Sequence, residues 1–241
     1  MDRMIYLSMS GAKATMQRQD VLANNLANVS TVGFRAELHA FRSVPVQGSG
    51  ASTRVYALES TPGYDATPGV VTATGRNLDV ALRGNAWLAL QSLDGTEAYT
   101  RGGSLELSAD GTLTTRSGLP ALGDGGPIQV PANSAISIAA DGTVSARNAA
   151  GVSSSVGRLK LVTPEAPLQR GDDGLFRAEE GELSADTTAR LQDGALEGSN
   201  VNPVEAMVSM IGAARQFEAQ MKLIQTAQAD ANAAGKLLSL G

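Results

Sequence analysis

Residues 200–241 read NVNPVEAMVSMIGAARQFEAQMKLIQTAQADANAAGKLLSLG. Asn202 and Pro203 provide a helix N-cap and a favoured first helical residue, and Glu205 follows at the spacing of a capping box. The remainder predicts one helix about 57 Å long, which is too long to bury against a domain of this size and needs another partner. An apolar repeat at intervals of three and four residues predicts a coiled-coil seam. Its members are Met207, Met210, Ala214, Phe217, Met221, Ile224, Gln228, Ala231, Gly235 and Leu238.

The other end of the chain also predicts a helix, over residues 4–27, about 36 Å long. Asn24, Asn25 and Asn28 lie near its end, and Gly33 provides an end point shortly afterwards. Three amides within five residues either terminate the helix or fix the register across a packed interface, as polar groups do in coiled coils. The apolar seam of this helix consists of Ile5, Met9, Ala12, Met16, Ala23 and Leu26.

The middle of the chain predicts short strands. Leu78, Val80 and Leu82 alternate with polar or small residues, and Gly84-Asn85 predicts a hairpin turn into the apolar run 87–90. Asp-Gly pairs tolerate the positive φ of tight turns, and they recur between the later strands. They stand at 94–95, 110–111, 124–125, 141–142, 173–174 and 193–194. Strands at this spacing indicate a small antiparallel sandwich or barrel.

Together these patterns predict an α+β fold with long N- and C-terminal helices that pair as a coiled coil. A small antiparallel all-β domain is inserted between them. The expected domains are a discontinuous helical core (1–35 and 200–241), an extended connector (36–76) and a β-rich outer domain (77–199). Alternatively, the helix seams pack on the β-rich middle. The small seam residues favour close helix–helix contact instead.

Composition excludes several kinds of site. The 241 residues include no cysteine and one histidine, His39, so disulfides and His/Cys zinc sites are ruled out, and we expect no metal and no cofactor. The net charge of −5 divides into +2 for residues 1–42, 0 for residues 203–241 and −7 between them. No basic stripe exists, so nucleic acid is not an expected partner. No apolar run fits a cleaved signal peptide or a membrane helix.

Acidic pairs are the remaining candidates for chemistry. Asp172-Asp173 and Glu179-Glu180 have the groups that acid–base catalysis uses, which leaves a periplasmic glycan hydrolase as a rival function. Nothing in the sequence places two carboxylates across a cleft, so we interpret them as solvated loop residues. A soluble export chaperone is another interpretation of the chain as a whole. We predict that the protein is not an enzyme and has no small-molecule substrate.

Two motifs flank the β-rich middle. They are ANNLANVSTVGF at residues 23–34 and LEGSNVNP at residues 196–203. The first closely resembles the N-terminal signature of bacterial flagellar rod and hook proteins, and the second, continued through residue 227, resembles their C-terminal signature. Residues 75–82 and 99–111 are similar to β-domain segments of that family. The resemblance covers most of the chain in the right order.

This resemblance implies a structural subunit of the proximal part of the flagellar rod, within the periplasm, where it transmits torque for motility. A distal-rod position is the alternative. It also implies export by the flagellar type III apparatus without a cleaved signal peptide. The implied partners are more basal rod subunits, the distal-rod protein and further copies of this chain. We predict that the assembly interface consists of Ile5, Met9, Ala12, Met16, Ala23, Asn24, Asn25, Leu26, Asn28, Gly33, Phe34, Asn200, Met207, Met210, Ala214, Phe217, Met221, Ile224, Ala231 and Leu238.

Overall fold

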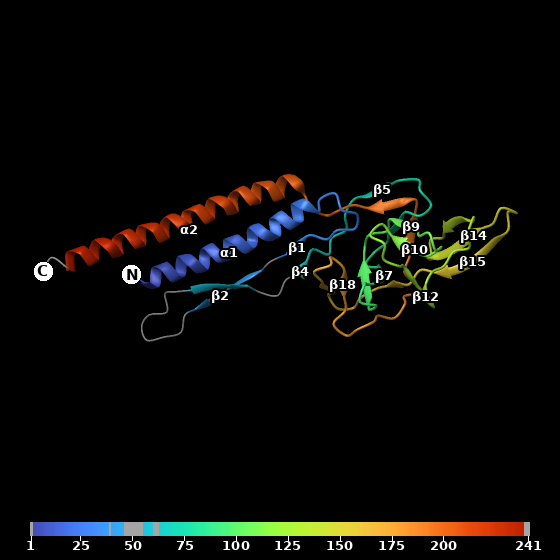
Figure 1. The fold of residues 1–241 in the computed structure, drawn as a ribbon, viewed down its shortest axis with the longest axis horizontal. Helices are drawn as coiled ribbons and strands as arrows, with labels where there is room; N and C mark the ends of the chain where they lie inside the picture. The colour runs from blue at the N-terminus through green and yellow to red at the C-terminus, as the bar shows by residue number, and fades with distance from the viewer. Residues whose placement is uncertain (1, 39, 46–54, 60–62, 239–241) are drawn as a thin grey trace. The chain divides into compact units, whose positions relative to one another are not determined.

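The computed structural model describes residues 2–38, 40–45, 55–59 and 63–238 (Figure 1). His39 and the side chains of the predicted seam residues Ala231 and Leu238 lie outside this described part. The chain forms two compact units. Unit 1 comprises Met1–Val29, Ala36–Asp65 and Val201–Gly241, and unit 2 comprises Ser30–Arg35 and Ala66–Asn200.

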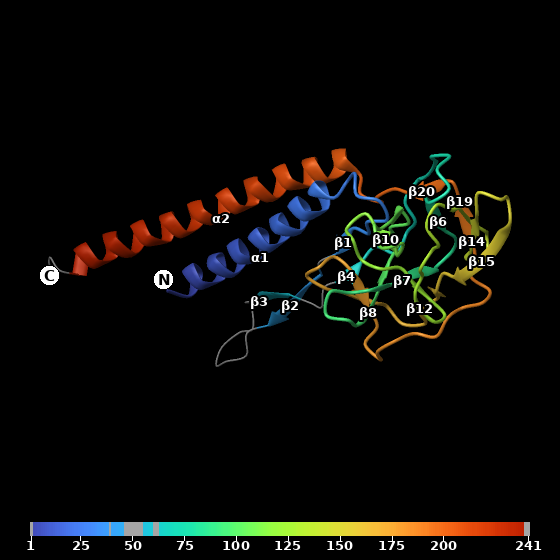
Figure 2. The ribbon, with the colours of Figure 1, turned by 45° about the vertical axis from the view of Figure 1, so that its right-hand side comes forward.

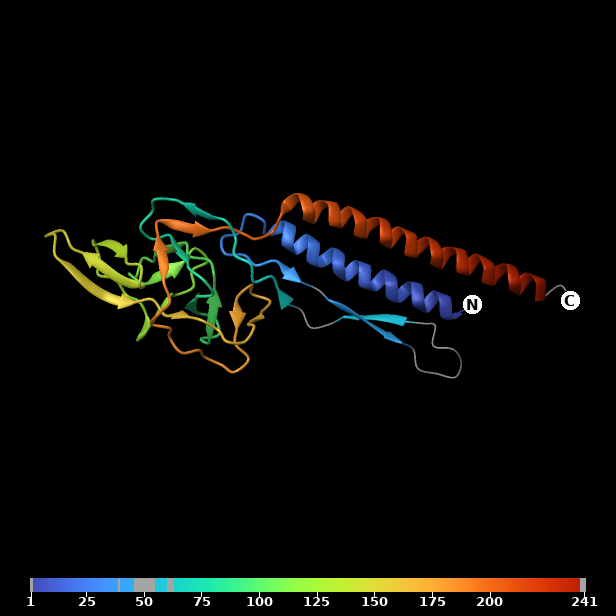
Figure 3. The same ribbon diagram turned by 180° about the vertical axis from the view of Figure 1, so that it is seen from behind.

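Unit 1 contains two long helices, α1 (Asp2–Ala27) and α2 (Pro203–Leu238). They lie side by side and run antiparallel in all three views (Figures 1, 2 and 3). The predicted N-cap is confirmed, because the Asn202 Oδ1 accepts hydrogen bonds from the backbone N–H groups of Val204 at 3.1 Å and Glu205 at 3.3 Å. These bonds satisfy two of the N–H groups that the first turn of a helix leaves unpaired.

The described residues of unit 1 also form four strands, all within the predicted connector. β1 (Glu37–Leu38) pairs with β4 (Gly63–Tyr64), and β2 (Phe41–Pro45) pairs with β3 (Val55–Glu59). Both pairs are antiparallel, and β3 packs against α1. The helical unit is therefore a mixed α/β structure.

The strands of unit 2 form several small antiparallel sheets. In chain order they are β5 (Val71–Ala73), β6 (Val80–Leu82), β7 (Trp87–Gln91), β8 (Glu97–Thr100), β9 (Leu105–Leu107), β10 (Leu113–Thr115), β11 (Leu122–Gly123), β12 (Gly126–Pro127), β13 (Ala135–Ile138), β14 (Thr143–Arg147), β15 (Ser153–Arg158), β16 (Leu161–Val162), β17 (Gln169–Arg170), β18 (Phe176–Arg177), β19 (Leu191–Asp193) and β20 (Ala195–Glu197).

The core of unit 2 surrounds the largest of these sheets, in which the strand order is β16-β7-β8-β18-β17. Leu88 and Leu90 of β7 are buried against Val80, Leu105 and Leu161 from neighbouring strands. Asp-Gly turns join β7 to β8, β9 to β10 and β13 to β14, as predicted. The predicted Gly84-Asn85 hairpin is wrong, because β6 pairs with β19 while β7 pairs with β8 and β16.

The predicted fold class is wrong in its two main features. The two helices are terminal, but they share their unit with four strands and do not form a coiled coil around one small inserted all-β domain. The β-rich part consists of several separate sheets. The physical reason lies on α1, where Ser8 and Thr15, on either side of the small Ala12, are buried and polar. A coiled coil needs an apolar seam at these positions.

The contact line of α2 also differs from the predicted seam. Its most buried residues are Ala206, Ala213 and Ala227, each one position before a predicted seam residue. Gly11 of α1 lies against Gln220 of α2, whose Cδ would be 3.1 Å from a Cβ added at Gly11. The two helices therefore approach most closely through small residues, while Met207, Val208 and Ile211 of α2 remain exposed.

Candidate functional site at the junction of the terminal motifs

The end of the N-terminal motif is held in unit 2 by the C-terminal motif. The Gly33 N–H donates to the Glu197 carbonyl oxygen at 2.7 Å, and the Asn200 N–H donates to the Phe34 carbonyl oxygen at 3.3 Å. Gly33 has a φ of +69°, and a Cβ there would lie 2.3 Å from the carbonyl carbon of Arg101. Only glycine fits this position, because it needs both a left-handed backbone and an absent side chain.

The Glu197 side chain is the centre of this arrangement. Its side chain is 1% exposed, and its Oε1 lies 2.7 Å from an Arg35 guanidinium nitrogen. The same Oε1 accepts the Gly69 N–H at 3.0 Å, and Oε2 accepts the Arg101 Nε–H at 2.9 Å. The two arginine side chains are 3% and 2% exposed. One buried carboxylate therefore faces two buried cations.

Backbone carbonyl groups accept further hydrogen bonds from both guanidinium groups. Arg101 donates to the carbonyl oxygens of Leu82 and Gly84, at 2.9 Å each, and to that of Ala86. Arg35 donates to the Thr67 carbonyl. Buried charges are tolerated when they are paired and hydrogen-bonded, and this network meets that condition.

A third segment completes the junction. The Asn200 Nδ2 donates to the Thr67 carbonyl at 3.0 Å, and the Gly198 N–H donates to the Val70 carbonyl at 2.9 Å. A Cβ at Gly69 would lie 2.0 Å from the Gly198 carbonyl oxygen, so these backbones approach too closely for a side chain. We call residues 33–35, 67–70 and 197–200 together with Arg101 the junction. The chain enters and leaves unit 2 only at the ends of Ser30–Arg35 and Ala66–Asn200, next to these segments.

Sequence reasoning placed Gly33, Phe34 and Asn200 in the functional set but missed Arg35, Arg101 and Glu197. A charged residue is expected to be exposed unless its partner is known, and here Glu197 lies 96 positions from Arg101 and 162 positions from Arg35. The sequence could have pointed to Arg35, Arg101 and Glu197 because each lies inside or next to a motif segment that carries the family resemblance.

The asparagines of the N-terminal motif make bonds within unit 1. Asn25 is buried, its Nδ2 donates to the Glu37 carbonyl at 3.0 Å, and its Oδ1 accepts the Glu37 N–H at 2.8 Å. Asn24 donates to the Glu37 carboxylate at 3.0 Å, and Asn28 donates to the Asn24 Oδ1 at 2.8 Å. These amides hold β1 beside the end of α1.

The other predicted interface residues fall into two groups. Those half-buried or buried in unit 1 are Ile5, Ala12, Leu26, Met210, Ala214, Phe217 and Ile224. Those exposed are Met9, Met16, Ala23, Met207 and Met221.

Exposed apolar side chains continue along both helices. On α2, Val204, Met207, Val208 and Ile211 follow helical spacing on one face and are between 51% and 68% exposed. On α1, Tyr6, Met9 and Met16 are between 54% and 60% exposed. By helical geometry the α2 residues lie opposite the side that contacts α1. We call the four α2 residues the outer apolar row.

Several aspartates of the described residues have a lowered pKa, which is the opposite of what a general acid needs. The hydroxyl and N–H groups of nearby threonines lower the pKa of Asp94, Asp141 and Asp186, and the pKa of Asp186 falls to about 2. Such carboxylates cap turns and are ionised at neutral pH, so they are unsuited to general acid catalysis. In the same part of the chain, no three His, Cys, Asp or Glu side chains are grouped to hold a metal, and neither helix is long and apolar enough to cross a membrane.

Comparisons with known proteins match all three parts of the chain. Residues 5–35 match the family model described as flagella basal body rod protein, residues 81–146 match the flagellar hook protein FlgE/F/G D1 domain, and residues 192–237 match the C-terminal part of flagellar basal body rod FlgEFG proteins. The flagellar basal-body rod proteins FlgF of Salmonella typhimurium and of Escherichia coli are each 50% identical over 251 residues, covering 100% of both chains. The rod protein FlgG of Bacillus subtilis is 33% identical and covers 93% of this chain and 94% of its own.

Proposed function

The chain belongs to the family of flagellar basal-body rod proteins and is a structural component of the rod, and on that premise we propose that it assembles through α1 and α2 in the proximal part of the rod. Its proposed partners are more basal rod subunits, the distal-rod protein and other copies of itself. In this position it transmits torque along the rod and catalyses no reaction.

The outer apolar row is the observation that carries the proposed mode of assembly. Met207 is 51% exposed and Val208 is 64% exposed, although both are apolar. Exposed apolar side chains that gather on one helical face mark interaction surfaces. Covering such a row with a neighbouring helix would remove it from water and stabilise the assembly by about 25 cal/mol per Å² of apolar surface.

The junction supports the proposed mechanical role. A subunit that transmits torque must keep the ends of its helices attached to its β-rich part under load. Glu197 bonds to Arg35, Arg101 and Gly69, so the three segments of the junction share one carboxylate. Pulling Arg35 or Arg101 away from Glu197 would leave a buried charge unpaired, which is strongly unfavourable.

The location and the route of export are further parts of the proposal. Family membership supports a place in the flagellar basal body, and we assign this protein to the periplasmic section of the rod. We also assign its export to the flagellar type III apparatus without cleavage of a signal peptide. The intact mass of the protein recovered from basal bodies tests the last point, because a cleaved leader would lower that mass by the leader's mass.

Charge substitution in the outer apolar row tests the proposed assembly. Met207→Glu and Val208→Glu are expected to leave the monomer folded, because both side chains are exposed, but to prevent rod assembly. The readouts are swimming in a host that lacks its own copy, and recovery of the variant in purified basal bodies. Gln216→Glu, an exposed polar residue of α2 away from the row, is the matched control. Normal swimming by both row variants would refute assembly through this face.

A further inference from the structure

One of the six Asp-Gly pairs, Asp124-Gly125, differs from the other five in its hydrogen bonding. In each of the other five, the glycine N–H donates to a backbone carbonyl oxygen at 2.8–3.0 Å, and the glycine φ lies between +63° and +88°. These glycines are Gly95, Gly111, Gly142, Gly174 and Gly194. Within the described residues no acceptor reaches the Gly125 N–H, and the φ of Gly125 lies outside the left-handed region.

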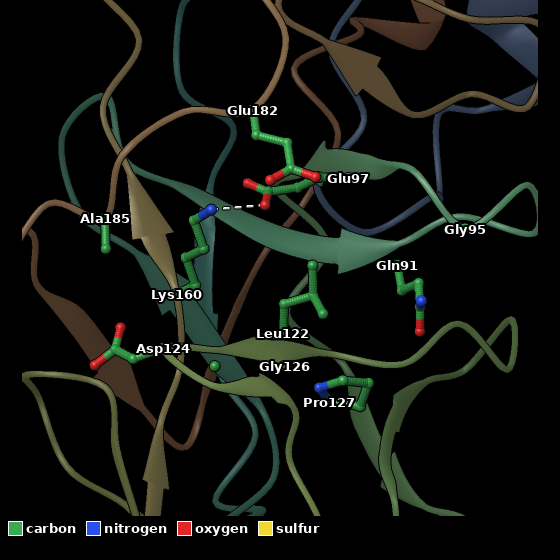
Figure 4. Close-up of a pocket in the computed structure, with 11 residues that line it drawn as sticks. Gln91, Gly95, Glu97, Leu122, Asp124, Gly126, Pro127, Lys160, Glu182 and Ala185 are labelled. Carbon is green, nitrogen blue, oxygen red and sulfur yellow. Dashed lines mark hydrogen bonds and ion pairs between the residues drawn. The ribbon is translucent and has the colours of Figure 1, made fainter.

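The Asp124 carboxylate is also held by no hydrogen bond. In three of the other pairs, a carboxylate oxygen accepts the backbone N–H two residues later at 2.9–3.1 Å, as aspartate does in many turns. These aspartates are Asp94, Asp141 and Asp173. In the part of the chain that the structure describes, no donor reaches Asp124. Figure 4 shows its side chain pointing away from Lys160, and no dashed line reaches it.

The turn that contains this pair is open to water. Gly123 of β11 pairs with Gly126 of β12, so Asp124 and Gly125 are the two residues between the strands, and both are exposed. A Cβ added at Gly125 would meet nothing within 4 Å. The turn also borders a pocket of about 580 Å³ that Asp124 and Gly126 help to line (Figure 4). The Asp124 side chain and the peptide group that follows it therefore have room to move.

We propose that Asp124 is a site of isoaspartate formation. The Gly125 nitrogen loses its proton to water and forms a bond to Cγ of the Asp124 carboxylic acid, whose hydroxyl group leaves as water. The product is a cyclic succinimide. A water molecule then opens the ring by breaking one of its two carbonyl carbon–nitrogen bonds. Breaking the bond to Cγ restores aspartate, whereas breaking the bond to the backbone carbonyl carbon leaves the main chain running through Cγ. The net change is an isomerisation without change of mass, and it needs no oxidant or reductant.

Hydrogen bonds slow the same reaction in the other pairs. Before the glycine nitrogen can approach Cγ, its own hydrogen bond must break, and so must any bond that holds the carboxylate. A segment that opens rarely reacts rarely. All six pairs consist of the same two residues, so their intrinsic reactivity is similar and the folded structure decides the order. Because opening costs the other pairs one or two hydrogen bonds, we expect Asp124 to react on the order of tenfold faster than any of them.

The test compares all six pairs within one sample of the full chain. The protein is incubated for weeks at neutral pH, either folded or in guanidinium chloride, and is then digested. Mass spectrometry with electron-transfer dissociation assigns isoaspartate to each position. In the folded chain Asp124 is expected to accumulate it about tenfold faster than the other pairs, and in denaturant all six are expected to react at similar rates. Accumulation at another pair that equals Asp124 in the folded chain would overturn the proposal. So would no reaction at Asp124 in the folded chain while the denatured chain reacts.

Two variants that keep the charge locate the reaction independently. Asp124→Glu would need a larger ring, which closes far more slowly, and Asp110→Glu makes the same change in another exposed Asp-Gly turn. Methyl transfer from S-adenosylmethionine by an isoaspartyl methyltransferase counts the total isoaspartate in the aged, folded protein. Asp124→Glu is expected to remove most of this signal and Asp110→Glu to leave it unchanged. Equal signals from the two variants would contradict the proposal. Both side chains are exposed, so neither variant is expected to unfold the chain.

Discussion

Replacement of Glu197 by glutamine is the most informative perturbation of the junction. Glutamine keeps the size of the side chain but removes its charge, so the Arg35 and Arg101 guanidinium groups lose the carboxylate that they share. Both are 3% exposed or less, and water cannot replace the carboxylate. Removing one partner of a buried ion pair lowers the free energy of unfolding by about 3–5 kcal/mol.

The single tryptophan provides a direct assay for this change. Trp87 is buried in the central sheet of unit 2, so its fluorescence reports the unfolding of that unit. With a urea m-value of about 2 kcal/mol/M, a loss of 3 kcal/mol would lower the unfolding midpoint by roughly 1.5 M. The m-value itself should not change. The matched control is Glu106→Gln on β9, an exposed residue whose replacement should alter the free energy of unfolding by about 0.5 kcal/mol or less.

A double variant separates charge from packing. If the loss arises from uncompensated charge, adding Arg35→Met to Glu197→Gln should restore about 1 kcal/mol or more, because neighbouring sites in one network are not additive. A loss below about 1 kcal/mol for Glu197→Gln alone would refute the reasoning. So would a double variant that is simply the sum of two losses.

Three further predictions concern single positions. Gly33→Ala should lower the free energy of unfolding by about 3 kcal/mol, because the new Cβ would overlap the backbone of Arg101. Gly118 also has a positive φ but faces open space, so Gly118→Ala should lower it by only about 1–2 kcal/mol. Equal losses in urea unfolding would contradict the steric argument. Asn25→Ala should lower the free energy of unfolding of the helices by about 2 kcal/mol, measured by thermal unfolding with far-UV circular dichroism, since it removes both hydrogen bonds between the Asn25 side chain and the Glu37 backbone. The pKa of the Asp186 carboxylate should be about 2, and the hydrogen bond from the Thr163 hydroxyl is the largest cause of this lowering. The stabilisation from ionised Asp186 is therefore complete above about pH 4 and is lost as the pH falls towards 2. In an NMR titration, Thr163→Val should raise the pKa of Asp186, and an unchanged value would disprove the assigned cause.

Local chemistry made the terminal helices predictable. Asn202 and Pro203 fix the start of α2, and Asn202 caps the helix as the sequence indicates. The contact line between the helices was less predictable, because apolar periodicity favours the largest side chains. Close approach of two helices instead selects small residues, and Ala206 and Ala213 therefore take the contact while Met207 lies one position away and is exposed.

The junction and the strand pairing depend on contacts between distant residues. Nothing near Glu197 in the sequence shows that its charge is neutralised by Arg35, which lies 162 positions earlier. Likewise, Gly84-Asn85 has the composition of a hairpin turn, but β6 pairs with β19, which is more than 100 residues away. The composition of a segment shows which local structures it can form. Which strand it pairs with depends on the packing of the whole core, which local composition does not show.

Cross-linking in purified basal bodies tests the central claim that the outward face of α2 contacts other rod subunits. The chain has no cysteine, so Val208→Cys introduces a single reactive site on the outer apolar row, and Gln216→Cys provides an exposed control away from it. We expect the Val208→Cys variant to form efficient adducts with neighbouring rod proteins or with a second copy of this chain, identified by mass spectrometry. The Gln216→Cys control should form far fewer adducts. A protein that is present in the basal body but forms no intersubunit adducts from position 208 would contradict the claim.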